Sequence, residues 1–222
     1  MRFLECCCTS FEEAVEAGIG GARRVELCSN LETGGLTPPM EMVRKTVETC
    51  RSMGINVLIR PRGGNFVYDE VEILQMKASI DECKALGANA VVIGALLPDG
   101  RIDKVTMQKL IEKARPMQVT FHRAFDECAD PLEALEDIIA LGCERLLTSG
   151  HEADAYTGRS LIAELVSKAR GRIVIMAGCG VRPHNIALIE KETGAVEFHS
   201  SSHGPDGHVD RETVRQLCQN SI

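Results

Sequence analysis

Three features of the 222-residue sequence predict an α/β fold of the (β/α)8 barrel class. Short β-branched or aliphatic segments alternate with amphipathic helical segments along the chain, which indicates a parallel sheet. Eight such pairs can be assigned, and eight favour a closed barrel over an open sheet. No linker, low-complexity tract or change of composition interrupts them, so we expect residues 1–222 to form one barrel domain.

Each predicted strand is a short apolar or β-branched run. The eight runs are Phe3–Cys7, Arg24–Cys28, Val57–Arg60, Ala90–Gly94, Gln118–His122, Arg145–Thr148, Ile173–Ala177 and Ala195–His199. Each predicted helix shows apolar residues at helical spacing. The helices are Ser10–Ala17, Glu41–Met53, Val71–Leu86, Lys104–Ala114, Pro131–Leu141, Ser160–Ala169, Pro183–Glu190 and Asp210–Cys218.

Helix start and stop signals support these assignments. Ser10 followed by Glu13 predicts a capping box, and prolines 131 and 183 stand where helices tolerate them, in the first turn. Glycines follow several helical runs just before a strand, where a left-handed residue commonly ends a helix. They are Gly54, Gly87, Gly142 and Gly171.

The composition is that of a globular protein whose core is aliphatic. Apolar residues make up 44% of the chain and charged residues 26%, while tryptophan is absent and aromatics are only 4%. The core must therefore consist of aliphatic side chains, Met and Cys, as in buried parallel sheets. The chain is somewhat shorter than the roughly 250 residues typical of this fold, so we expect tight connections.

Charge and cysteine usage exclude several classes of protein. The net charge is −7 and the basic residues are scattered, which argues against a nucleic-acid partner. No apolar run reaches the ~18 residues of a membrane span, and the N-terminal stretch does not resemble a signal peptide. The ten cysteines include no CxxC pair and lie among regular elements, so we expect reduced thiols and a cytoplasmic protein.

Polar residues gather at the carboxyl ends of the predicted strands, where barrels of this class build their working sites. They are Glu5, Glu26, Arg60, Arg62, His122, Arg123, Thr148, Ser149, His199 and Ser200. An internal ion-pair network that only plugs the barrel is the alternative interpretation. A charged cluster confined to one end is more often functional, because such clusters shift pKa values.

Alternation along the strands predicts which of these side chains face inward. Glu5 shares a face with Cys7, and Glu26 shares a face with Cys28. Burying either glutamate against the helices would be costly, so both pairs should point into the barrel. Cys6 has the opposite parity, as does Cys8, and both should face the helices.

The polar cluster predicts acid–base chemistry. Glu5 or Glu26 would act as general base and His122 as general acid or electrophile. Three arginines, Arg60, Arg62 and Arg123, would neutralise charge on a small anionic molecule. No dinucleotide fingerprint or Walker loop is present, so no nucleotide cofactor is predicted.

Glycine-containing loops after the last strands predict an anion site. In this fold a phosphate commonly binds behind strands seven and eight, where backbone N–H groups can approach it. The candidate residues are Ser149, Gly150, Gly178, Gly180, His199 and Ser200. The alternative is that the glycines only relieve crowding in tight turns.

Two cysteines end neighbouring predicted strands. Parallel strands lie about 4.8 Å apart, so Cys7 and Cys28 could hold one soft ion such as Cu(I) between their thiolates. The alternative is that both are buried thiols that pack as small apolar groups. The sequence contains no HxH or HExxH motif that would indicate zinc.

The strand ends together resemble the CutC family, and the match runs from the first strand to the eighth. The matching segments are Glu5-x-Cys7, Arg24–Cys28, Gly34–Pro38, Ile59–Gly64 (IRPRGG), Thr120–Asp126 (TFHRAFD), Leu147–Gly150 and Glu197–Ser200. The resemblance implies a (β/α)8 barrel, a cytoplasmic location and a role in copper homeostasis, with Cu(I) binding in some members. Cys7 and Cys28 match family cysteine positions. The chain departs from the family in a shorter segment after the eighth strand, residues 201–208.

Two functions therefore stay open. One is a copper-homeostasis protein that binds Cu(I) at Cys7 and Cys28. The other is an isomerase- or lyase-type enzyme that acts on a small phosphorylated or otherwise anionic metabolite. The sequence is compatible with a homo-oligomer but does not decide the oligomeric state.

Overall fold

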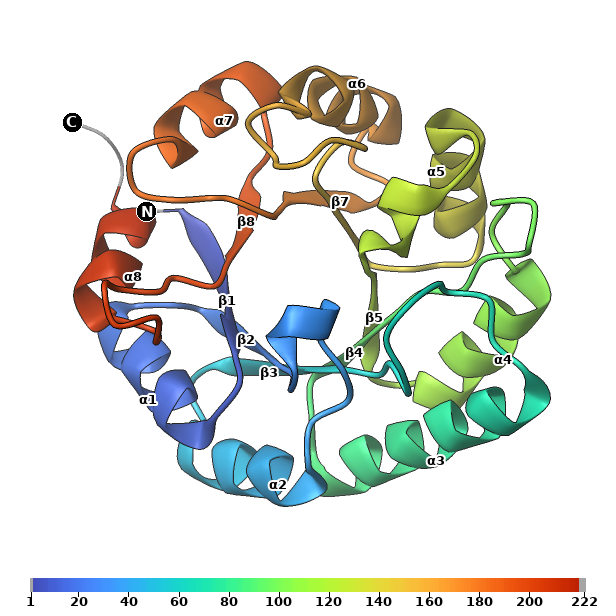
Figure 1. Cartoon of the computed structure of the whole chain (residues 1–222), viewed down its shortest axis with the longest axis horizontal. Helices are drawn as coiled ribbons and strands as arrows, with labels where there is room; N and C mark the ends of the chain where they lie inside the picture. Colours follow the sequence, from blue (N-terminus) through green and yellow to red (C-terminus); the bar gives the residue numbers. More distant parts are fainter. Residues whose placement is uncertain (1, 220–222) are drawn as a thin grey trace.

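The computed structural model describes residues 2–219, and over these residues the chain forms a closed barrel (Figure 1). Eight parallel strands pair in chain order, and β8 returns to pair with β1. Helices α1 to α8 form a ring around the strands (Figure 1). The predicted (β/α)8 fold is therefore confirmed.

The strands are short and the helices alternate with them throughout. The strands are β1 Phe3–Cys8, β2 Arg24–Leu27, β3 Gly54–Leu58, β4 Ala90–Ile93, β5 Gln118–Phe121, β6 Arg145–Thr148, β7 Val174–Ala177 and β8 Glu197–Ser200. The helices are α1 Phe11–Gly20, α2 Met40–Thr49, α3 Glu70–Leu86, α4 Lys104–Ala114, α5 Pro131–Ala140, α6 Arg159–Ala169, α7 Ile186–Thr193 and α8 Arg211–Cys218. None of these helices has the length and apolar character needed to cross a membrane.

Two short 3-10 helices follow strands, η1 Leu31–Thr33 after β2 and η2 Arg123–Glu127 after β5, and the sequence did not predict either. Both lie at the carboxyl-terminal end of the barrel. They bring additional loop residues to the same end of the molecule as the polar strand ends.

The expected glycine stop at Gly54 is wrong. Helix α2 already ends at Thr49, with Cys50 as its cap, and Gly54 instead opens β3 beside Arg24. Strand β3 therefore begins three residues earlier than predicted. The other three glycines do adopt left-handed conformations, with φ of 85° at Gly87, 80° at Gly142 and 73° at Gly171.

The predicted start of the seventh helix is also displaced. The helix begins at Ile186 rather than at Pro183. The side chain of Asn185 accepts a hydrogen bond from the backbone N–H of Arg182. This turn occupies the residues that the proline signal had assigned to the helix.

The two faces of the barrel strands are sorted as the alternation predicts. Cys6 and Cys8 lie in the large apolar layer between strands and helices. Cys7 and Cys28 instead belong to a small apolar cluster inside the barrel, with Leu58 and Val92 as its other buried members. The inward direction of both thiols is thereby confirmed.

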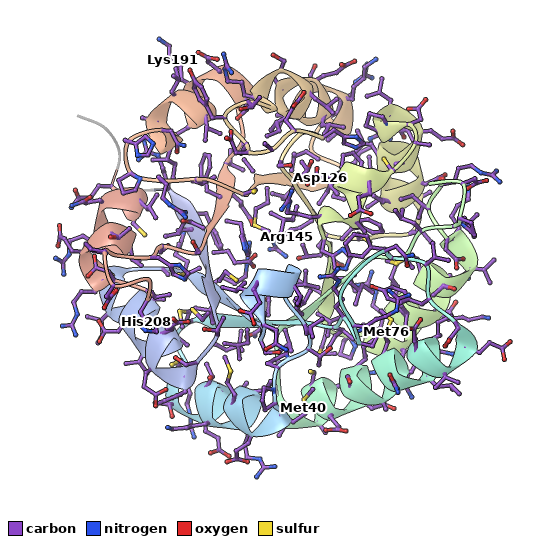
Figure 2. All side chains as sticks on the ribbon, viewed as in Figure 1. Met40, Met76, Asp126, Arg145, Lys191 and His208 are labelled. Carbon is purple, nitrogen blue, oxygen red and sulfur yellow. The ribbon has the colours of Figure 1, made fainter. Side chains whose placement is uncertain are left out.

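A chain of ion pairs fills the interior near the amino ends of the strands. Arg24 donates to Glu5 and to Glu197 at 2.5 Å each, and Arg145 donates to Glu197 at 3.0 Å. Figure 2 shows Arg145 within the ring of strands. Buried charges are tolerated when they are paired. This network fills the interior at the amino ends of the strands, and other residues line the interior at the carboxyl ends.

The seam between the first and last helices gives a test of the packing. A Cβ at Gly20 would lie 2.6 Å from Val214 Cβ and 2.8 Å from the Arg211 carbonyl oxygen. Alanine favours a helix over glycine by about 1 kcal/mol, but overpacking of this kind costs about 1–3 kcal/mol. We expect Gly20→Ala to lower the free energy of unfolding in urea denaturation, by up to ~2 kcal/mol after the helix gain is subtracted.

The same helix offers a control. A Cβ at Gly18 would meet only the flexible end of Met53, at 3.7 Å. Gly18→Ala should therefore leave stability unchanged or raise it by up to about 1 kcal/mol. Equal effects of the two substitutions would contradict the close contact between α1 and α8.

Candidate functional site

A cavity of about 760 Å³ lies at the carboxyl ends of the strands. Residues from the ends of several strands, and from the loops that follow them, line it. Of the residues predicted from sequence, those that line it are Cys7, Glu26, Cys28, Arg60, His122, Arg123, Gly180, His199 and Ser200. The barrel thus brings the two thiols, one of the glutamates and most of the predicted cations into one space.

Five predicted residues do not line the cavity, and two of them are charged. Glu5 is fully buried beneath His199, inside the barrel. Arg62 turns to the rim, where it pairs with Glu72 at 2.5 Å. The other three are Ser149, Gly150 and Gly178, and none of them is among the lining residues.

Steric crowding explains the glycine at position 178. A Cβ there would lie 2.4 Å from Leu147 Cδ1 and 3.1 Å from His199 Cβ. Gly180 is crowded as well, because a Cβ there would lie 2.8 Å from Asp154 Cβ, and its φ is 69°. The steric alternative raised for the glycine loop therefore fits both residues, and of the two only Gly180 lines the cavity.

Ser149 belongs to a hydrogen-bond network around Asp126 that was not predicted from the sequence. Its hydroxyl donates to Asp126 at 3.0 Å, and the hydroxyl of Thr148 donates to the same carboxylate at 2.5 Å. Arg123 pairs with Asp126 at 2.8 Å. Asp126, which is labelled in Figure 2, thus holds the loop after β6 against η2. It lies in the quoted TFHRAFD segment, which was the only signal for it.

A second overlooked residue is Arg182, which lines the cavity beside Ser200. Its Nη1 donates to the Ser200 hydroxyl oxygen at 3.4 Å. That hydroxyl in turn donates to the Val181 carbonyl at 2.8 Å. The wall formed by the loops after β7 and β8 therefore carries a cation, which a search of strand ends alone could not detect.

The two inward thiols lie side by side in the cavity wall. Cys7 Sγ and Cys28 Sγ are 3.4 Å apart, and the residues expose only 5% and 1% of their surface. The hydrogen bond shared with Cys28, together with burial, raises the pKa of the Cys7 thiol well above its usual value. The separation exceeds the ~2.05 Å of a disulfide, so both are free thiols that share one hydrogen bond.

His199 lies between the two predicted glutamates. Its Nδ1 is 2.9 Å from Glu5 Oε1, and its Nε2 is 3.3 Å from Glu26 Oε2. Burial would raise the pKa of Glu5, but the Arg24 charge and the His199 hydrogen bond lower that pKa to about 2. Burial raises the pKa of Glu26 to about 7. The two carboxyl groups are thus pushed towards opposite protonation states.

Three potential metal ligands converge beside the thiol pair. One ligand atom each from Cys7, Glu26 and His199 lies within 4.8 Å of the other two. Over residues 2–219 this is the one group of three or more His, Cys, Asp or Glu side chains with such spacing. The thiol pair and this group share Cys7.

His122 presents a hydrogen-bond donor without a partner. Its Nδ1 accepts from the Ala124 N–H at 3.1 Å, which caps η2, and no group in the described chain bonds Nε2. Burial, and then the nearby Arg60 charge, lower the pKa of His122 to about 3. The ring is therefore neutral, and its proton must reside on Nε2.

Arg60 is a buried cation bonded to neutral groups. Its two terminal nitrogens donate to the carbonyl oxygens of Thr33, Gly35 and Gly64, at 2.7–3.0 Å. Its Nε has no partner, and no carboxylate of residues 2–219 pairs with the guanidinium. The Phe66 ring packs against both Arg60 and His122.

The depressed pKa of His122 makes stability depend on pH. Between about pH 6.5 and pH 3 the unfolded chain binds a proton on this residue and the folded chain does not. Stability therefore falls as pH decreases, by at most ~1.4 kcal/mol per pH unit from this group. His122→Asn preserves the cap, because asparagine is a good N-cap residue, and removes the titration.

We expect urea denaturation of His122→Asn to show a shallower loss of stability than the wild type from pH 6.5 to pH 4. His184→Asn, at an exposed position, serves as control and should retain the wild-type slope. Parallel slopes for the wild type and His122→Asn would show that this histidine is not buried in its neutral form.

Comparisons with known proteins match the fold and nearly the whole sequence of this chain. A CutC family protein of Parabacteroides distasonis is 52% identical over 201 residues, which cover 90% of this chain and 83% of that protein. The human copper homeostasis protein cutC homolog is 47% identical over 199 residues, 90% of this chain and 72% of its own length. The crystal structure of CutC from Streptococcus agalactiae superposes with a TM-score of 0.87 at 31% identity, covering 90% of this chain and 99% of that one. The sequence profile of the CutC family matches residues 2–204, and the chain belongs to the CutC family.

Proposed function

We propose that this protein acts in copper homeostasis and binds Cu(I) between the thiolates of Cys7 and Cys28. The 3.4 Å separation of the two sulfur atoms in the cavity wall is the observation that carries the proposal. The copper-homeostasis names of the human and streptococcal relatives support it.

The thiol pair fits a soft cation. Metal–sulfur bonds of about 2.3 Å allow both sulfur atoms to contact one ion at this separation. Thiolates select soft metals such as Cu(I) over hard ones. Leu58 and Leu31 pack against the pair and form an apolar wall on one side, while both cysteines line the cavity, so an ion can reach them. Copper here is cargo that the protein would hold and pass on.

Replacing both thiols tests the proposal. We expect the double variant Cys7→Ser with Cys28→Ser to lose at least about 100-fold in Cu(I) affinity, because a hydroxyl is a poor ligand for a soft ion. Titration against a competing Cu(I) chelator measures the change. Cys50→Ser, which alters a half-buried thiol next to α2, is the control and should retain wild-type affinity. Unchanged affinity in the double variant would refute the site.

A second function is supported by a separate observation, the unpaired cation of Arg60. A buried charge without a counter-ion is costly, so an anion bound in the cavity would stabilise it. Arg182 adds positive charge to the opposite wall, and the neutral His122 ring offers an Nε2–H donor. With Glu26 as proton acceptor, this set suits isomerase- or lyase-type chemistry on a small phosphorylated or carboxylated molecule.

Ligand-induced stabilisation tests this second function. Sugar phosphates and small carboxylates should raise the melting temperature saturably, with ~2.7 kcal/mol of stabilisation at 100 times the dissociation constant. Arg182→Gln should reduce the effect of the phosphates, while Arg101→Gln, at an exposed position, should not. If no compound exceeds sodium chloride of equal ionic strength, the cavity does not bind these anions.

A further inference from the structure

Three neighbouring strands place different ligand types on one patch of the cavity wall. In the register of the barrel, Cys7 of β1 lies beside Glu26 of β2, and His199 of β8 lies beside Glu5 of β1. All four side chains point inward. The ligand atoms of Cys7, Glu26 and His199 consequently lie within 4.8 Å of one another.

His199 is oriented as metal-binding histidines usually are. Such a histidine donates its second ring N–H to a carboxylate, which fixes the ring and leaves the other nitrogen for the ion. Here Nδ1 faces Glu5 Oε1 at 2.9 Å, so Nε2 is the nitrogen that faces Glu26 and the cavity. Glu5 itself is held by Arg24 at 2.5 Å and by Asn56 at 2.9 Å.

We propose that Cys7 Sγ, a Glu26 carboxylate oxygen and His199 Nε2 form a second donor set, for a borderline divalent cation such as Zn²⁺. Its ligands differ in kind from those of the copper site. The two sites have one ligand in common, Cys7. The zinc proposal rests on the proposed function only through this shared cysteine. Cys28 is not a member of this set.

The donor types favour zinc over the alternatives. Sulfur, nitrogen and oxygen together suit a borderline ion, whereas two thiolates suit Cu(I) and oxygen alone suits Mg²⁺ or Ca²⁺. Three protein ligands with a fourth position open to the cavity is the arrangement of catalytic rather than structural zinc sites. One thiolate and one carboxylate also balance the two positive charges of the ion.

Metal binding has a defined proton balance. The ion replaces the thiol proton of Cys7 and the proton that His199 Nε2 shares with Glu26, and both protons pass to water. The pair of His199 and Glu26 is therefore the metal-free form of the same site. If this pair is only structural, substitutions in it will change stability and leave Zn²⁺ affinity unaffected.

The experiment uses the full chain and two metals. Zn²⁺ affinity is measured against a competing chelator, and Cu(I) affinity against its own chelator. Co²⁺ serves as a spectroscopic probe, because a cobalt–thiolate bond gives a charge-transfer band. His199→Asn keeps an N–H near the Nδ1 position for Glu5 and removes the Nε2 ligand.

The two metals should respond to different substitutions. We expect His199→Asn to lower Zn²⁺ affinity at least about 100-fold and to change Cu(I) affinity less than about threefold. We expect Cys28→Ser to lower Cu(I) affinity at least about 100-fold and to change Zn²⁺ affinity less than about threefold. Cys7→Ser should weaken both metals and abolish the Co²⁺ charge-transfer band. If His199→Asn does not fold by circular dichroism, Glu26→Gln replaces it, with an expected loss of Zn²⁺ affinity of at least about tenfold.

Each result has one meaning. Unchanged Zn²⁺ affinity in His199→Asn, or the same Zn²⁺ affinity in wild type and Cys7→Ser, overturns the second donor set. If Zn²⁺ affinity falls on substitution of His199 while Cu(I) affinity is unchanged by substitution of either cysteine, the zinc site is supported and the copper site is rejected. The control His184→Asn should match the wild type for both metals.

Discussion

The buried ion pair between Glu5 and Arg24 is the interaction on which the cavity wall depends. One oxygen of Glu5 accepts from Arg24 and from Asn56, and the other faces Nδ1 of His199. A buried carboxylate of this kind is stable only while its partners remain in place. The ion pair therefore fixes the ring of His199, and with it the nitrogen that faces Glu26. The buried charges near the amino ends of the strands thus position His199 and Glu26 in the cavity at the carboxyl ends.

Alternation along the strands predicts the side that each residue faces, but only while the strand continues. It separates Cys7, inside the barrel, from Cys6 on the helix side, because neighbouring residues point to opposite faces. Arg62 was expected with Arg60 as a cation for a bound anion, but it does not line the cavity. Strand β3 ends at Leu58, so residue 62 lies in a loop where the period of two no longer applies. There the guanidinium turns away to Glu72.

The sequence pattern could not predict two properties. One is how deep in the barrel an inward side chain lies, and the other is the conformation of the loops that follow the strands. Parity assigned Glu5 to the interior correctly, yet the layer it occupies lies beneath His199 rather than in the cavity. Asp126 and Arg182 reach the cavity from segments that follow strands, where no periodicity relates a residue to a direction. Their positions depend on hydrogen bonds to distant segments, such as that between Asp126 and Ser149, which only the folded chain brings together.

The sequence contains no local zinc motif because the three proposed ligands come from three different strands of the barrel. Local motifs arise when one helix or loop supplies several ligands, whereas here each of three strands supplies one. Cys7 and His199 are almost two hundred residues apart, and they become neighbours only because β8 pairs with β1. In an open sheet with the same strand order these two strands would form opposite edges. Closure of the barrel therefore creates the mixed donor set, whereas the thiol pair needs only the adjacent strands β1 and β2. Helices α1 and α8 also pack against each other. Their contact lies at the strand pair on which the mixed donor set depends and the thiol pair does not.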